Sequence, residues 1–424
     1  MHTRSEHRAG LGFGPLQLRV SAAGLAGLFV ALAIAASSIV FSEPAVADVL
    51  MMGVIVGVPV LGVGRFGIVT VAMLCIWLGI VGLGVLGTTF SENTFSSAIT
   101  HQVVTLYLVC GATVLAGFIA ADAERRFRLV MLCYVVSALL ATAAGLAGYF
   151  NVLPGAYDLF TNFGRARGTF KDPNVYGAAI APALVACAWV MLREPALRAR
   201  MALAAALPMT LGMLLCFSRG AWISVAVSLV ILALIAFATS RRRTDFRRFR
   251  NFAIAGTGAV LLALVGILQV EKVRSLLEER ASLDQTYDNG PEGRFGGQAK
   301  ARALIIANPL GIGTHTFRTV HHTEEPHNVY LSMFLNAGWL GGLLYIVAVL
   351  ATLAVGLRGA VRRTALQGPF LIALAAFAGV AVEGAVIDSD HWRSFFILMA
   401  CIWGLADAPA PKVDPARRRE DGVA

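Results

Sequence analysis

The sequence has little charge for its length. Of its 424 residues, 14% are charged and 57% are hydrophobic, whereas soluble domains have about 25% charged and about 45–50% apolar residues. So few polar side chains cannot cover a water-soluble particle, which excludes a cytosolic enzyme. Cysteine is also scarce, and all six cysteines lie inside apolar runs without paired spacing. We therefore expect neither a disulfide framework nor a cysteine metal site.

Long apolar runs are what the sequence has instead. They recur along the chain with lengths of about 17 to 25 residues, enough for a helix to cross about 30 Å of hydrocarbon. The sequence therefore predicts an all-α, polytopic helical membrane protein with about twelve spans, in a single membrane domain over residues 1–424. We expect the first run to stay as a span, because it is long and lacks a small-residue cleavage site. The predicted spans are residues 20–41, 48–64, 66–87, 103–121, 129–150, 173–192, 201–217, 220–239, 252–270, 327–357, 366–387 and 394–408.

Basic residues outnumber acidic ones by 35 to 25, which gives a net charge of +10. Most of the basic residues lie in short loops on one side of the predicted spans. This distribution follows the positive-inside rule and predicts that both termini are cytoplasmic, with residues 409–424 as a tail. The positive charge therefore indicates topology, and we expect no nucleic-acid partner.

The basic residues on the outer side are the exceptions. They gather in a long hydrophilic segment before the tenth span (residues 271–326), in the loop 151–172, and at Arg219 in a tight turn. We expect residues 271–326 to contain short helices, over 271–283 and 297–307. Since topology does not call for positive charge on this side, these residues are candidates for function.

Arginine and histidine are the leading candidates on the outer side. Arg219, Arg294 and Arg318 could converge there, and guanidinium groups match phosphate oxygens in two-point geometry, which suggests a lipid-linked phosphate or diphosphate. Each could equally be an interfacial anchor or the partner of a nearby carboxylate. His327, at the outer end of the tenth span, can exchange a proton near neutral pH. A helix-capping role is the alternative for His327.

Other polar clusters allow weaker interpretations. Arg165, Arg167 and Lys171 form a patch suited to an anionic ligand or a lipid headgroup. Residues 388–393 can be interpreted as a self-neutralised loop, and Glu383 is the main candidate for an acid within the membrane. The set His315, His321, His322, Glu324 and Glu325 lacks metal-ligand spacing, so we expect no metal there.

Taken together, several short motifs resemble the O-antigen ligase and polymerase superfamily of bacterial inner-membrane proteins. No single motif is strong, but their order and spacing are fairly specific. The motifs are Arg167-Gly168-Thr169-Phe170, Asp172-Pro173-Asn174, Ser218-Arg219-Gly220, Arg294, Asn308-Pro309-Leu310-Gly311-Ile312-Gly313 and His327-Asn328, followed by Gly338 and Gly341.

The resemblance implies a metal-independent, inverting glycosyltransferase without a cofactor. Such an enzyme moves a glycan from undecaprenyl diphosphate to an acceptor hydroxyl on the periplasmic face of the inner membrane. By motif, Arg219 and Arg294 correspond to the arginines that hold the donor diphosphate, and His327 to the general base. The resemblance also makes further residues candidates for substrate binding: Arg318, Arg167, Lys171, Arg165 and Asn328.

Three functions remain open at this point. The first is ligation of the glycan to lipid A–core, and the second is polymerisation of O-antigen or exopolysaccharide units on the lipid carrier. Ligase and polymerase share the motifs quoted above, so the resemblance does not separate them, and we take the ligase as the first choice. The implied partners are the lipid-linked donor, lipid A–core or a growing glycan, and membrane lipids. A transporter of lipid-linked oligosaccharides is the third, and it is disfavoured because the polar residues gather on one outer face instead of at mid-membrane.

Overall fold

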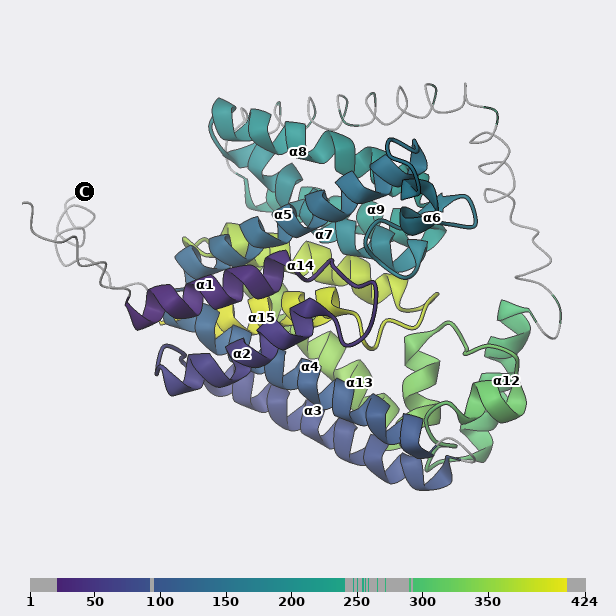
Figure 1. Cartoon of the computed structure of the whole chain (residues 1–424). Helices are drawn as coiled ribbons and strands as arrows, with labels where there is room; N and C mark the ends of the chain where they lie inside the picture. The colour runs from purple at the N-terminus through teal and green to yellow at the C-terminus, as the bar shows by residue number, and fades with distance from the viewer. Residues whose placement is uncertain are drawn as a thin grey trace, which may run out of the picture.

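The computed structural model describes residues 21–91, 95–240 and 293–409, with eight isolated positions between 247 and 290. Apart from one short hairpin, the elements of these residues are helices (Figure 1). They are α1 (Ala22–Ala35), α2 (Val46–Val60), α3 (Ile68–Gly87), η1 (Thr88–Phe90), α4 (Phe95–Ala121), α5 (Ala123–Tyr149), α6 (Ala156–Phe160), β1 (Thr161–Asn162), β2 (Arg165–Ala166), α7 (Pro173–Arg193), α8 (Ala196–Leu215), α9 (Arg219–Thr239), α12 (Arg294–Ala307), η2 (Phe317–His321), α13 (Val329–Val361), α14 (Gln367–Glu383) and α15 (Arg393–Ala406).

Helices long and apolar enough to cross a membrane dominate the described residues. Seven meet both criteria: α3 (with η1), α4, α5, α7, α8, α9 and α13; four shorter apolar helices are α1, α2, α14 and α15. These eleven coincide with eleven of the predicted spans. The predicted span 252–270 lies outside the described residues. The protein is thus a polytopic helical membrane protein, and the total of twelve spans stays a prediction.

The connection between α5 and α7 departs from the expected all-α structure. It contains α6 and an antiparallel hairpin in which Asn162 pairs with Arg165. Strands of two residues are too short to show alternation in a sequence, which is why they were not predicted. The predicted helix over 297–307 is confirmed as α12, which begins earlier, at Arg294. The helix predicted over 271–283 lies outside the described residues.

The core of the protein surrounds α14 and α15. Helix α14 packs against α7, α9, α13 and α15, and α15 packs against α4. Trp77 of α3 contacts Tyr345, Phe395 and Phe396, with ring centroids 5.3 to 6.2 Å apart. At 1.5 Å per residue, α14 and α15 are about 26 and about 21 Å long, less than the thickness of the hydrocarbon core. Because longer helices enclose them, these two helices are buried mainly by protein.

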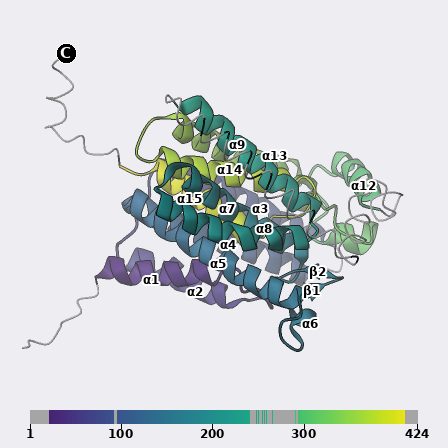
Figure 2. The same cartoon turned by 90° about the horizontal axis from the view of Figure 1, so that it is seen from above.

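The connections that carry the outer basic residues meet at one end of the helices. Thr169 Oγ1 donates to the carbonyl of Ser38 at 2.6 Å, joining the α5–α7 and α1–α2 connections. Helices α6 and α12 lie toward this end in both views (Figures 1 and 2). At the opposite end, Asp407 accepts hydrogen bonds from the backbone N–H groups of Val69 and Thr70. The loops predicted to be outer therefore share one end of the molecule.

Helix α12 is held against α13 by an unusual break in α13. Gly338 has φ 70° and ψ −174° inside that helix, and the next residue, Trp339, donates its backbone N–H to the carbonyl of Pro309 at 2.9 Å. The Trp339 ring nitrogen also donates to the carbonyl of Ile305 at 2.7 Å. A Cβ on Gly338 would lie 2.7 Å from the carbonyl oxygen of Pro309. Only glycine fits both this conformation and this space.

A Gly338→Ala variant is expected to lose stability. The strained backbone and the clash together should cost about 1–3 kcal/mol, measured as a lower midpoint of thermal unfolding in detergent. Gly82→Ala is the matched control, because Gly82 lies in α3 with no atom within 4 Å of the added Cβ. Equal unfolding midpoints for the two variants would contradict the packing described for α12 and α13.

Candidate functional site

The polar cluster at the end that is predicted to be outer is built on the loop between α14 and α15, residues 384–392. The start of α13 is bonded directly to this loop and to the end of α14. The Val329 N–H donates to the carbonyl of Gly384 at 2.9 Å, and the Asn328 side chain donates to the carbonyl of Ala385 at 3.0 Å. Asn328 also caps α13 by accepting from the Leu331 N–H. The first turn of α13 and the loop therefore form one unit.

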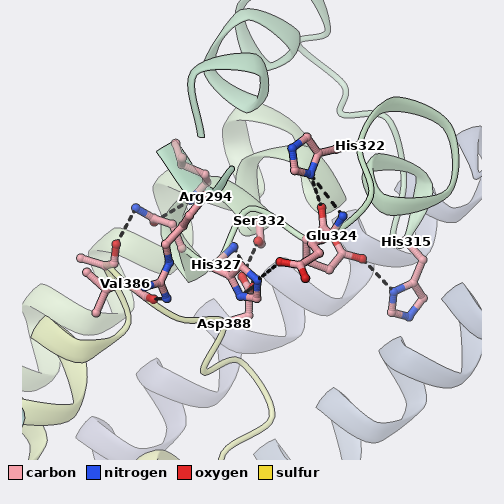
Figure 3. Close-up of polar contacts among 12 residues, drawn as sticks. Arg294, His315, His322, Glu324, His327, Ser332, Val386 and Asp388 are labelled. Atoms are coloured by element: carbon pink, nitrogen blue, oxygen red, sulfur yellow. Dashed lines mark hydrogen bonds and ion pairs between the residues drawn. The ribbon is translucent and has the colours of Figure 1, made fainter. Parts of the chain in front are cut away.

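His327 lies between two carboxylates in this unit (Figure 3). Its backbone has a φ of 49°, a left-handed conformation that is costly for a residue with a Cβ. The His327 N–H donates to Asp388 Oδ2 at 3.0 Å, which holds this conformation. On the ring, Nε2 is 3.0 Å from Glu324 Oε2 and Nδ1 is 4.0 Å from Asp388 Oδ2. With Nε2–H donating to Glu324, Nδ1 carries the lone pair that can accept a proton.

Asp388 joins the pieces of this arrangement. Its second oxygen accepts a hydrogen bond from Ser332 Oγ at 2.6 Å, one turn into α13. Burial, followed by the negative charge of Asp390, raises the pKa of Asp388 to about 6, although the Ser332 hydrogen bond and His327 act in the opposite direction. One carboxyl group thus fixes both the backbone of His327 and the first turn of α13.

The sequence allows a self-neutralised loop at residues 388–393, whereas in the structure the charged residues of this loop contact other segments. Asp388 contacts His327 and Ser332, Asp390 pairs with His101, and Arg393 forms a two-point ion pair with Asp48 of α2. Each of these partners lies at least 56 residues away in the chain. The charged residues of this loop therefore bind other segments, which local sequence analysis could not reveal.

The predicted arginines reach the same loop from two other helices. Arg294 is the first residue of α12, and one of its terminal nitrogens donates to the carbonyl of Val386 (Figure 3). Arg219 is the half-buried first residue of α9. A Cβ on its neighbour Gly220 would lie 3.5 Å from the Val386 side chain. The three predicted catalytic residues therefore come from segments that converge on residues 384–392.

Glu383 is the buried acid at the end of α14. Its side chain is 1% exposed, and its Oε1 would be 3.3 Å from a Cβ on Gly220. The lack of a side chain at Gly220 lets this carboxyl group approach the first turn of α9. The N-terminus of a helix favours a negative charge. Glu383 lies at such an N-terminus, beside the turn that carries Arg219.

The three cations of the α5–α7 connection differ in their surroundings. Arg165 is buried, and it donates to the carbonyl of Cys216 and to the side chain of Asn174, both at 2.7 Å. It therefore supports the turn just before Arg219. Arg167 donates to carbonyls of its own loop, whereas the exposed Lys171 forms an ion pair with Glu43 at 3.2 Å. Lys171 also lines a cavity of about 210 Å³ that extends to Arg393.

Arg318 is exposed on η2, in the connection between α12 and α13. Among the neighbouring histidines, the buried ring of His322 stacks on Phe317 with centroids 5.6 Å apart. His315 Nδ1 instead lies 3.4 Å from Glu325. Sequence reasoning missed Asp388 and Ser332 as partners of His327 and of α13. The sequence shows only that residues 388–393 are rich in charge, which does not predict which distant residues they contact.

Comparison with known families identifies part of the chain. Residues 204–346 match the family model described as O-antigen ligase. The matched segment contains Arg219, Arg294, Arg318, His327 and Asn328, while Asp388 lies beyond it. The comparison with curated proteins finds no match. The family match confirms, over this part of the chain, the resemblance inferred from the motifs.

Proposed function

We propose that this protein is a metal-independent, inverting glycosyltransferase of the O-antigen ligase type. Its donor is a glycan on undecaprenyl diphosphate, and its acceptor is a hydroxyl group of lipid A–core. One observation carries the proposal: His327, flanked by Glu324 and Asp388, is bonded to the loop 384–392, which Arg294 also contacts and which the first turn of α9 approaches. Proton acceptor and cations for a diphosphate are thus assembled in one place.

The reaction requires a base on the acceptor side. The acceptor oxygen attacks the anomeric carbon, the bond from that carbon to the diphosphate oxygen breaks, and the diphosphate leaves with the electron pair. The hydroxyl proton passes to Nδ1 of His327, while Glu324 holds the Nε2–H and stabilises the imidazolium that forms. Attack from the face opposite the leaving group inverts the anomeric carbon. Asp388 acts on the position of His327 through its backbone bond.

The leaving diphosphate requires fixed positive charge. Negative charge grows on the diphosphate as the sugar–phosphate bond breaks, so nearby guanidinium groups stabilise the transition state more than the ground state. Arg219 and Arg294 begin helices α9 and α12. The N-terminal N–H groups of these helices add further attraction for an anion. Arg318, Arg165, Arg167, Lys171 and Asn328 are assigned secondary contacts to phosphate or glycan, with Arg165 also supporting the Arg219 turn.

The same geometry suits a polymerase, which uses the same donor but a growing carrier-linked glycan as acceptor. Transport is less compatible, because the polar groups described here gather at the outer ends of helices. The charge distribution supports a bacterial inner-membrane location with both termini cytoplasmic and the site facing the periplasm. The partners we propose are the lipid-linked donor, the lipid A–core or glycan acceptor, and the surrounding lipids.

Product analysis in liposomes tests ligase against polymerase. The purified protein is given an undecaprenyl-diphosphate repeat unit, first alone and then with lipid A–core, and the products are separated by size. We expect glycan on lipid A–core and no elongation without it. A ladder of carrier-linked glycans in the absence of lipid A–core would identify a polymerase instead. If neither product forms although both substrates are present, glycosyl transfer is the wrong reaction.

Replacing His327 by alanine should remove the base. General base catalysis contributes about 10²–10⁴-fold, so the transfer rate of His327→Ala is expected to fall by at least about 100-fold in the same liposomes. The control is His321→Ala, which removes another histidine from the α12–α13 connection. Both variants should elute as folded protein in gel filtration. A folded His327→Ala variant with wild-type turnover would rule out the assigned base.

The arginine assignment depends on two-point geometry and not on charge alone. Arg219→Lys keeps the charge but loses the planar fork, so its transfer rate should fall nearly as far as that of Arg219→Ala. Arg362→Lys, at the exposed inner end of α13, serves as the control and should behave like the wild type. Full activity in Arg219→Lys would refute two-point binding of the diphosphate.

A further inference from the structure

A second polar cluster lies beside the site, formed by residues that the proposed reaction does not use. His101 belongs to α4, whereas Asp390 and His391 lie in the same loop as Asp388. One ligand atom from each of the three lies within 4.8 Å of the other two. His101 Nε2 is 3.0 Å from Asp390 Oδ2, and the rings of His101 and His391 have centroids 4.0 Å apart. Two imidazoles and one carboxylate thus face one small volume.

The hydrogen bonds around His391 determine which of its nitrogens is available. Thr105, one turn along α4 from His101, donates its hydroxyl hydrogen to the His101 carbonyl at 3.0 Å. Since a hydroxyl group has a single hydrogen, Thr105 must accept at its 2.9 Å contact with His391 Nε2. Nε2 therefore carries the ring proton, which leaves the lone pair on Nδ1. A second hydrogen bond that fixes the tautomer in this way is typical of metal-binding histidines.

We propose that His101, Asp390 and His391 bind one divalent transition-metal cation of the Zn²⁺ class. The donor set of two nitrogens and one oxygen suits such a cation, whereas Mg²⁺ and Ca²⁺ prefer oxygen ligands alone. A tetrahedral ion with bonds of about 2.0–2.2 Å requires ligand atoms about 3.4 Å apart. The His101–Asp390 pair already lies within this spacing, and the other ligand atoms, which lie within 4.8 Å of one another, need to move closer by up to about 1.4 Å. His315 stands edge-on to His101 and pairs with Glu325, so it is outside the proposed ligand set.

The proposed ion would join α4 to the loop 384–392. Asp390 lies two residues from Asp388, which holds His327. A cation at this position would restrict the loop from α4, in addition to the contacts that the loop makes with the start of α13. The proposal therefore assigns the metal a structural role, independent of the metal-free transfer reaction.

Metal binding can be measured without any glycosyl substrate. Protein purified in detergent without a polyhistidine tag is titrated with Zn²⁺ by calorimetry, and retained zinc is counted by atomic emission. We expect one equivalent in the wild type, at least about 100-fold weaker binding in Asp390→Asn and His391→Ala, and about 10–100-fold weaker binding in Thr105→Val. His321→Ala should match the wild type, and excess Mg²⁺ should not compete. Unchanged binding in both ligand variants, or none in the wild type, would overturn the proposal.

Co²⁺ supplies a test that does not depend on variants. Added to the wild-type protein, Co²⁺ should give the intense visible absorption of a low-coordinate ion with nitrogen ligands, and Zn²⁺ should abolish it. If the added Co²⁺ shows no more than the weak absorption of the hydrated ion, a site of this kind is refuted. This outcome does not depend on whether the ligand variants fold. Because both measurements are made without donor or acceptor, failure of the glycosyltransferase proposal would leave their outcome unchanged.

Discussion

The hydrocarbon core of a membrane contains no water to satisfy a backbone N–H or C=O group, and this constraint determines where chemistry can occur in the protein. The chain meets it with helices, and the charged residues of the proposed site lie at or near helix ends. Arg219 begins α9, Arg294 begins α12, and Asn328 caps α13. The ends that face residues 384–392 are therefore helix N-termini, which carry partial positive charge. The fold itself thus favours an anion at the place where the arginines converge.

Two strained backbone positions belong to the proposed site: Phe217, two residues before Arg219, and His327 itself. Phe217 and His327 both have positive φ angles, of 48° and 49°, and such conformations cost about 1–3 kcal/mol each. Each is compensated by a buried polar group from a distant segment. Arg165 bonds to the carbonyl of Cys216, just before Phe217, and Asp388 bonds to the N–H of His327. The two contacts have the same function: they hold the chain in the conformation from which Arg219 or His327 projects.

The sequence predicts those features that depend on residues close together in the chain. The lengths of the apolar runs predict the positions of the eleven apolar helices. The stop signal Asn308-Pro309 predicts where α12 ends. The motif order also indicates the resemblance to O-antigen ligases, which the match over residues 204–346 confirms for that part of the chain. The partners of His327 could not be found in this way, because Asp388 lies 61 residues further along the chain. The hairpin at Arg165 was missed for a different reason, since two-residue strands have no periodicity.

The lengths of the helices explain why residues 384–392 can serve as the base of a site. Helix α9 has 21 residues and α13 has 33, whereas α14 and α15 have 17 and 14. The loop that joins α14 and α15 is packed among the longer helices at Ser389, which is 1% exposed, and open at Val386, which is 36% exposed. Charges and dipoles act more strongly where water is excluded. The proposed base His327, which is bonded to Asp388 next to Ser389, lies toward the packed part of the loop, whereas Arg294 contacts the open part at Val386.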